Sequence, residues 1–265
     1  GLTDVTISYD RPGVKGREGK IWGQLVHTGY TDQGFGTSKA APWRAGANEN
    51  TVIGFSTDVK IEGQELPAGK YGFFIAYDPN ECTLIFSKNH TSWGSYFYNE
   101  QEDALRVKVK PRPLEKSVEW LKYEFSDQAE NSARVSLQWE KLSIPFTIEV
   151  DYIKEQLASF RRELRTEKGF LWQSWDQAAQ WCLQRNVNLE EALRWADSAS
   201  GNFGGNKSFQ AWSTRAQLLN KLGHSQEAGA VMKEALPFAS MNEIHQYGRQ
   251  LLVLKNYKEA LEVFK

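Results

Sequence analysis

Apolar and polar residues alternate in short runs along the first 150 residues, and glycine, proline and aspartate separate the runs. A period of two places every second side chain on one face of an extended chain, so the pattern predicts β-strands. Asp78-Pro-Asn-Glu81 fits a type I turn and predicts an antiparallel hairpin between the strands on either side. Many short strands joined by tight turns are typical of an antiparallel sandwich. The predicted strands are 5–9, 21–26, 51–55, 59–61, 71–77, 82–87, 105–109, 121–125, 135–139 and 144–150.

The period becomes helical at Asp151. Ile153, Leu157, Phe160 and Leu164 recur on one face of a predicted helix, and the sequence beyond Gly169 indicates further short helices. A chain of 265 residues also exceeds the usual length of one domain. We therefore expect an α+β protein with an all-β antiparallel sandwich at 1–150, a linker helix at 151–168 and an all-α domain at 169–265.

Three similar segments recur in the helical region. Ala192, Ala228 and Ala260 each follow a glutamate, and they are separated by 36 and 32 residues. These separations bracket the period of about 34 residues in tetratricopeptide repeats, so we expect a tetratricopeptide-like fold. A glycine-rich loop is predicted at 202–207.

The residues from Thr28 to Asn50 show neither the period of a strand nor that of a helix, so they are predicted to form a loop. A loop of this length is usually functional or disordered. Its segment Trp43-Arg-Ala-Gly-Ala-Asn-Glu49 offers a stacking surface, a guanidinium, an amide and a carboxylate. We therefore predict that Trp43, Arg44, Asn48 and Glu49 bind a small polar ligand such as a sugar or a carboxylate. The alternative is that Arg44 pairs with Glu49 or with backbone carbonyls and only braces the loop.

A second aromatic segment, Thr91-Ser-Trp-Gly-Ser-Tyr96, supplies further candidate walls for the same site. Trp93 and Tyr96 join the predicted ligand-binding set, and Tyr98 is a further candidate wall. Ordinary packing at the core or edge of a strand explains the alternation of Tyr96 and Tyr98 equally well. Whether the two segments meet in space cannot be deduced from one sequence.

Charge and composition narrow the possible functions. The net charge is -1 without long runs of like charge, which argues against nucleic-acid binding and against a basic membrane patch. No window approaches the roughly 18 consecutive apolar residues of a membrane span. Arg106, Lys108 and Lys110 alternate with apolar residues and are interpreted as an exposed sheet face. Cys82 and Cys182 lie in unrelated patterns and are expected to be buried free thiols.

No pattern in the sequence indicates a catalytic site. The four histidines occur singly, and nucleophile elbows, phosphate loops and dinucleotide-binding glycine patterns are missing. We therefore predict no catalytic residues, no metal and no cofactor. Glu49 and Asp103 could act as a pair of carboxylates on a glycan, although nothing in their spacing favours this pairing.

Four segments in order resemble the domain-of-unknown-function family DUF2911. They are Arg11-Pro-Gly-Val-Lys-Gly-Arg17, Trp43–Glu49, Asp58-Val-Lys-Ile61 with Leu66-Pro-Ala-Gly-Lys-Tyr71, and Trp93-Gly-Ser-Tyr-Phe-Tyr98. The resemblance covers about residues 5–150, and longer members also append a tetratricopeptide-like tail. It implies export to the periplasm or outside the cell, but it carries no established activity and transfers no catalytic residue. The segment Thr28–Pro42 is longer here than in shorter members.

Three hypotheses follow for the function. The leading one is an exported, noncatalytic protein whose sandwich binds a small polar or glycan ligand. The second is an interaction scaffold whose helical tail binds a protein partner. The third is a glycan-acting hydrolase.

Overall fold

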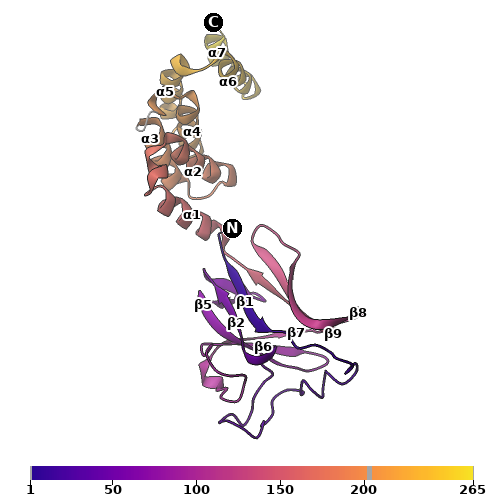
Figure 1. Ribbon diagram of the computed structural model, residues 1–265. Coiled ribbons are helices and arrows are strands. Elements are labelled where there is room, and N and C mark those ends of the chain that lie inside the picture. The colour runs from indigo at the N-terminus through magenta and orange to yellow at the C-terminus, as the bar shows by residue number, and fades with distance from the viewer. Residues whose placement is uncertain (1, 202–204, 265) are drawn as a thin grey trace. The chain divides into compact units, whose positions relative to one another are not determined.

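The computed structural model describes residues 2–201 and 205–264. These residues divide into two compact units, and the division lies between Gln156 and Leu157. Antiparallel β-sheets form the first unit and α-helices form the second, as the change of period predicts (Figure 1). The α+β layout is thereby confirmed.

The first sheet has five strands in the order β1-β2-β5-β6-β7. Its β5 and β6 form the predicted antiparallel hairpin. The carboxylate of Asp78 accepts hydrogen bonds from the N–H groups of Asn80 and Glu81, at 2.8 and 3.2 Å, and so closes the turn between them. The strands are β1 (Val5–Asp10), β2 (Ala47–Phe55), β5 (Gly69–Ala76), β6 (Cys82–Ser87) and β7 (Asp103–Val109).

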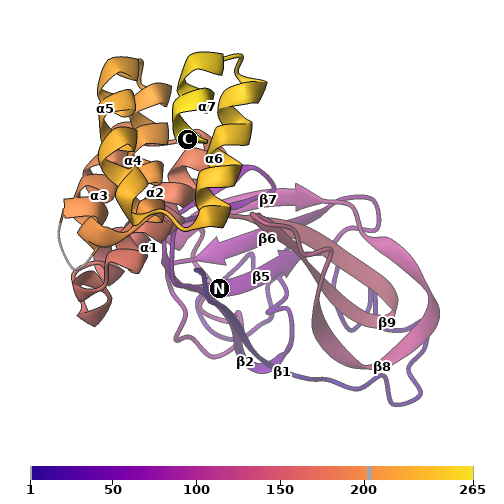
Figure 2. The ribbon, with the colours of Figure 1, turned by 90° about the horizontal axis from the view of Figure 1, so that it is seen from above.

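The second sheet has four strands in the order β4-β3-β9-β8. They are β4 (Gln64–Leu66), β3 (Val59–Ile61), β9 (Ser132–Glu149) and β8 (Arg112–Ser126). Figures 1 and 2 show β8 and β9 as a long, curved pair, and their register shifts twice between Pro113 and Lys122. Irregularities of this kind bend a strand pair and increase its twist.

Two predicted strands, 135–139 and 144–150, are parts of the single strand β9. Glu140 lies between them with φ at 51° and with its side chain buried, and its carboxylate accepts a hydrogen bond from the N–H of Gly19 at 2.6 Å. The alternation breaks at this residue while strand pairing continues, which is why the sequence pattern indicates two strands.

The prediction of a strand at 21–26 is wrong. Ile21 and Val26 are both buried, but the segment between them is a tight turn in which the N–H of Val26 donates to the carbonyl of Ile21 at 2.8 Å. Gly23 supplies a positive φ of 80° at this turn. The two apolar residues anchor a turn in the core instead of alternating along a strand.

One hydrophobic core lies between the two sheets. Ile53, Phe73 and Leu84 enter it from the first sheet, and Leu121 and Ile148 enter it from the second. Both sheets therefore bury one face against the other, which is the arrangement of a sandwich.

Seven α-helices are assigned among the described residues of the second part of the chain. They are α1 (Tyr152–Glu163), α2 (Trp172–Arg185), α3 (Leu189–Gly201), α4 (Phe209–Lys221), α5 (Ser225–Ala235), α6 (Met241–Val253) and α7 (Tyr257–Val263). Successive helices α2 and α3, α4 and α5, and α6 and α7 pack as pairs (Figure 2).

Small residues lie where the paired helices approach each other. Ala192, Ala228 and Ala260 of the predicted repeat are all buried. The pairing agrees with a repeat of two helices, but the tetratricopeptide-like character of this region stays a prediction. Of the predicted glycine-rich loop, 202–204 lie outside the described residues, and Gly205–Lys207 forms a short 3-10 helix.

Both cysteines are buried and free, as predicted. Burial raises the pKa of each thiol to about 11, so both are protonated at neutral pH. None of the described helices is long and apolar enough to cross a bilayer.

Candidate functional site

Two loops meet over the outer face of the five-stranded sheet. The long loop (residues 28–46) precedes β2, and the aromatic loop (residues 88–99) follows β6. The N–H groups of Thr37 and Ser38 donate to the carbonyl of Tyr96 at 3.0 and 2.9 Å, and the Phe35 ring lies edge-on to the Tyr96 ring. The two segments that supply the predicted ligand-binding residues are therefore in contact.

Trp43 lies in the core and not on the surface of the long loop. Its backbone pairs with Ile75 in both directions, at 2.9 and 2.8 Å, and the residue is 8 % exposed. Its indole stacks on Trp139, with centroids 6.2 Å apart, and lies edge-on to Trp22. In this structure the ring faces other indoles and presents little surface to a ligand.

Arg44 connects the two loops. Its Nη1 donates to the carbonyl of Asn48 at 2.8 Å, and its guanidinium lies 5.1 Å from the centroid of the Tyr96 ring. Gly94 lies so close that a Cβ at this position would be 2.7 Å from the guanidinium carbon. Arg44 therefore braces the loop against a backbone carbonyl, as the alternative interpretation expects.

The other predicted ligand-binding residues are more exposed. Asn48, with φ at 54°, and Glu49 are both exposed at the start of β2, and Trp93 is 54 % exposed in the aromatic loop. The structure thus brings Arg44, Tyr96 and the main chain of Asn48 together, whereas Trp43 faces the core. The assignment of these residues to ligand binding stays a prediction.

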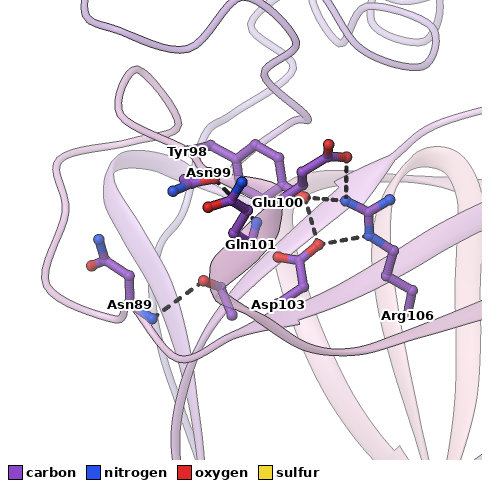
Figure 3. A network of polar contacts seen from close by, with 8 residues as sticks. Asn89, Tyr98, Asn99, Glu100, Gln101, Asp103 and Arg106 are labelled. Atoms are coloured by element: carbon purple, nitrogen blue, oxygen red, sulfur yellow. Dashed lines mark hydrogen bonds and ion pairs between the residues drawn. The ribbon is translucent and has the colours of Figure 1, made fainter.

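A hydrogen-bonded network lies beside these loops, at the start of β7 (Figure 3). The Tyr98 hydroxyl donates to Oδ2 of Asp103 at 2.7 Å, and Nε of Arg106 donates to the same oxygen at 2.6 Å. Nη2 of Arg106 lies 2.8 Å from the Tyr98 hydroxyl and 3.5 Å from the carboxylate of Glu100. Tyr98, Asp103 and Arg106 therefore each contact the other two side chains.

A β-bulge is the reason that Asp103 and Arg106 meet. Residues three apart on a strand normally point to opposite faces. The pairing of β6 with β7 shifts between Phe86 and Ser87, so that Leu105 and Asp103 oppose consecutive residues and Ala104 is extra. The extra residue turns Asp103 to the face that carries Arg106.

An open cleft of about 520 Å³ adjoins this network. The Tyr30 ring lies 6.0 Å from the Arg106 guanidinium, and Lys39 forms an ion pair with Asp32 at 3.0 Å. Hydroxyl, amide, carboxylate and cationic groups thus surround one space with an aromatic ring at its side. The lining residues are Tyr30, Thr37, Ser38, Lys39, Ala40, Tyr98, Asn99, Glu100 and Arg106.

The charges around the cleft nearly cancel. Arg106 is opposed by Asp103 and Glu100, and Lys39 is opposed by Asp32. A cleft with balanced charge does not attract ions of one sign over long distances. Its polar groups are therefore better suited to a neutral ligand than to an anion.

Asp103 is the most buried of the acidic groups here, with a side chain only 8 % exposed. Burial raises its pKa, although the hydrogen bonds from Tyr98 and Arg106 act in the opposite direction. Burial likewise raises the pKa of Tyr98, whose hydroxyl therefore stays protonated at neutral pH. Oδ1 of Asp103 is buried and has no hydrogen-bond partner within the described part of the chain.

Sequence reasoning missed most of this cleft. Arg106, Lys108 and Lys110 are exposed as predicted, but the pattern does not indicate that Arg106 lines a cleft, and it does not single out Tyr30. Asp103 was considered only as a partner of Glu49, but β5 and β6 lie between their strands. Three interstrand spacings separate the two backbones by roughly 14 Å, so the sheet order gives this carboxylate pair no support. No local sequence signal reveals the bulge that brings Asp103 to Arg106.

The fold defines the class of this protein. It is a protein with a two-sheet antiparallel β unit followed by paired helices. Residues 1–148 match the family described as "Protein of unknown function (DUF2911)", and the chain belongs to this family. The resemblance found in the four sequence segments is thereby confirmed. No curated protein and no solved structure matches the chain.

Proposed function

We propose that the β-sheet unit binds a neutral, polyhydroxylated ligand, a sugar or a small glycan, in the cleft beside Arg106. The observation that carries this proposal is the set of mixed donors and acceptors with balanced charge around a space of about 520 Å³. Clefts of about 300–1,000 Å³ hold small organic ligands.

The polar groups of the cleft suit the hydroxyl groups of a sugar, which both donate and accept hydrogen bonds. Glu100 offers acceptor oxygens, Arg106 and Lys39 offer donors, and Ser38 offers a hydroxyl. The Tyr30 ring, 41 % exposed, supplies an apolar face for the C–H side of a sugar ring. The ligand would exchange its hydrogen bonds to water for bonds to fixed protein groups.

The proposal is one of binding without catalysis. The sheet order does not favour catalysis by the pair of carboxylates Glu49 and Asp103, because β5 and β6 lie between their strands. We also propose export to the periplasm or outside the cell, and this part of the proposal rests on the family resemblance alone. The predicted site around Arg44 and Tyr96 remains a second position for the same class of ligand, because these residues belong to the two loops that also line the cleft.

Calorimetric titration of the full chain with a panel of neutral monosaccharides and oligosaccharides tests the proposal. The informative variant is Glu100→Gln, and the matched control is Glu81→Gln, because both carboxylates pair with a basic residue of β7 but only Glu100 lines the cleft. We expect Glu100→Gln, which removes a charged hydrogen-bond partner, and Tyr30→Ala, which removes the apolar face beside the sugar ring, each to weaken sugar binding about tenfold. Glu81→Gln should bind like the parent.

The proposal is overturned if the parent binds no sugar of the panel, or if Glu100→Gln and Glu81→Gln have equal effects. Arg44→Ala separates the two positions on the β unit. A large loss of affinity in Arg44→Ala, with none in Glu100→Gln, would move the site to the Arg44 side of the loops.

A further inference from the structure

A pair of aromatic rings lies beside the cleft, where the long loop meets the aromatic loop. The Phe35 ring is 68 % exposed and lies edge-on to the half-buried Tyr96 ring, with centroids 5.5 Å apart. A single exposed ring is common on protein surfaces, but this one is held by a second ring and has polar groups next to it. We call Phe35, Arg44, Asn48 and Tyr96 the platform.

Arg44 supplies hydrogen-bond donors over the Tyr96 ring. Its guanidinium lies 5.1 Å from the ring centroid, and its Nη1 donates to the carbonyl of Asn48 at 2.8 Å. A guanidinium carries five N–H groups, and within the described part of the chain this is the one hydrogen bond that Arg44 makes. The exposed carboxamide of Asn48 has no hydrogen-bond partner there either. The platform thus combines aromatic rings with available donors and acceptors.

The platform and the cleft are joined through the same stretch of backbone. The carbonyl of Tyr96 accepts hydrogen bonds from the N–H groups of Thr37 and Ser38, and both of these residues line the cleft. Phe35 comes two residues before Thr37, and Tyr96 comes two residues before Tyr98 of the cleft wall. Two residues of extended chain span at most about 7 Å. The platform therefore adjoins the cleft along both loops.

From this arrangement we infer that the β unit binds a glycan chain, with one sugar unit in the cleft beside Arg106 and the following units on the platform. The inference rests on the proposed binding of a sugar in the cleft. The cleft is open, so the chain can continue out of it and stack the C–H face of a sugar ring on Phe35, which buries apolar surface of both partners. The available donors of Arg44 then meet hydroxyl groups at the edge of that sugar. Glu100 and Arg44 become two contacts of one ligand.

A series of oligosaccharides of increasing length tests the inference on the full chain. The probes are α-1,4-linked glucose, β-1,4-linked glucose and β-1,4-linked mannose, each from the single sugar to the hexamer, and the measurement is calorimetric titration. We expect the affinity to rise about tenfold from the single sugar to the tetramer and then to stay constant. The plateau follows because units beyond the platform gain no further contact.

Variants show whether the platform causes the gain with length. Phe35→Ala removes the exposed ring, and Phe125→Ala is its matched control, because Phe125 is 41 % exposed on β8 of the other sheet. We expect Phe35→Ala to weaken tetramer binding about fivefold and to leave binding of the single sugar unchanged. Phe35→Tyr keeps the ring and should keep the gain, and Phe125→Ala should bind like the parent. Glu100→Gln should weaken every length alike, since its carboxylate lines the cleft.

Three results overturn the inference. They are an affinity that does not depend on chain length, a loss in Phe35→Ala that is equal for the single sugar and the tetramer, and equal effects of Phe35→Ala and Phe125→Ala. Each of these leaves the proposed function standing, provided that the single sugars bind and that Glu100→Gln weakens them. Failure of every probe to bind would overturn both.

Discussion

At the scale of single residues, glycines determine how closely the two loops of the β unit approach. Gly36 has φ at 76°, and a Cβ added there would lie 2.3 Å from the carbonyl oxygen of Tyr96. This carbonyl is the one that accepts hydrogen bonds from Thr37 and Ser38. The absence of a side chain at Gly36 therefore allows the contact that positions one wall of the cleft.

Gly36→Ala and Gly34→Ala form a matched pair for testing this contact. Both glycines have a positive φ, 76° and 71°, but a Cβ at Gly34 would meet nothing within 4 Å. We expect Gly34→Ala to lower the free energy of unfolding by about 1 kcal/mol from backbone strain alone. The clash with Tyr96 should add roughly 1–3 kcal/mol in Gly36→Ala. Urea unfolding measures both, and equal losses would show that the contact with Tyr96 is unimportant.

The sequence indicated the loops as the place of polar chemistry, but it could not orient individual side chains. The absence of a period around Trp43 predicts a loop residue that stacks on a ligand, whereas its backbone pairs with Ile75 and its ring enters the core. Arg106 is exposed on its sheet face, as predicted, but alternation alone does not predict its contacts with Tyr98 and Asp103. A bulge one residue long changes its neighbours.

At the scale of elements, the last two described helices depend on another close approach. Gly248 is buried in α6, and an added Cβ would lie 2.2 Å from the Phe264 ring that follows α7. The ring also lies edge-on to His245 of α6, with centroids 6.0 Å apart. Phe264 thus packs against α6 at Gly248, where the helix carries no side chain.

Gly248→Ala should therefore reverse the usual effect of alanine in a helix. Replacing glycine by alanine inside an open helix normally stabilises it by about 1 kcal/mol. We expect this gain in Gly229→Ala, where the nearest neighbour is the end of a glutamate side chain at 3.9 Å. Gly248→Ala should instead release α7 and speed its amide hydrogen exchange at least tenfold. Unchanged exchange in α7 would refute the role of this contact.

Elements with a regular period were predicted well, and irregular ones were not. Strands β3 and β6 lie at the predicted residues, and the hairpin between β5 and β6 was recognised from its turn. The apolar residues Ile21 and Val26 predict a strand at 21–26, but a turn can bury two such residues just as well. Periodicity records which side chains are buried, and it does not record which backbone groups are paired.

At the scale of the whole molecule, the helix α1 spans the residues where the two units divide. Leu157, Phe160 and Leu164 of the predicted linker, 151–168, pack in the helical cluster that contains Cys182 and Trp195. These apolar side chains give the segment a structural role within the helical unit. The boundaries 1–150, 151–168 and 169–265 stay predictions that fragments of the chain can test.

Three fragments decide where the helical unit begins. We expect 1–150 to fold alone, because it contains both sheets and their core. We expect 151–265 to be more stable than 169–265 by several kcal/mol, since the shorter fragment lacks Leu157, Phe160 and Leu164. Thermal unfolding followed by circular dichroism makes the comparison. Equal melting of the two helical fragments would identify 151–168 as a simple connector.

The indole cluster in the β unit gives the molecule an optical property of its own. Trp22, Trp43 and Trp139 lie within 5.6 to 6.2 Å of one another in a rigid core. Transition dipoles held at such short range couple strongly, so this trio should dominate the near-ultraviolet circular dichroism of the β unit. Because Trp43 immediately precedes Arg44, the signal reports on the anchoring of the long loop without any added label.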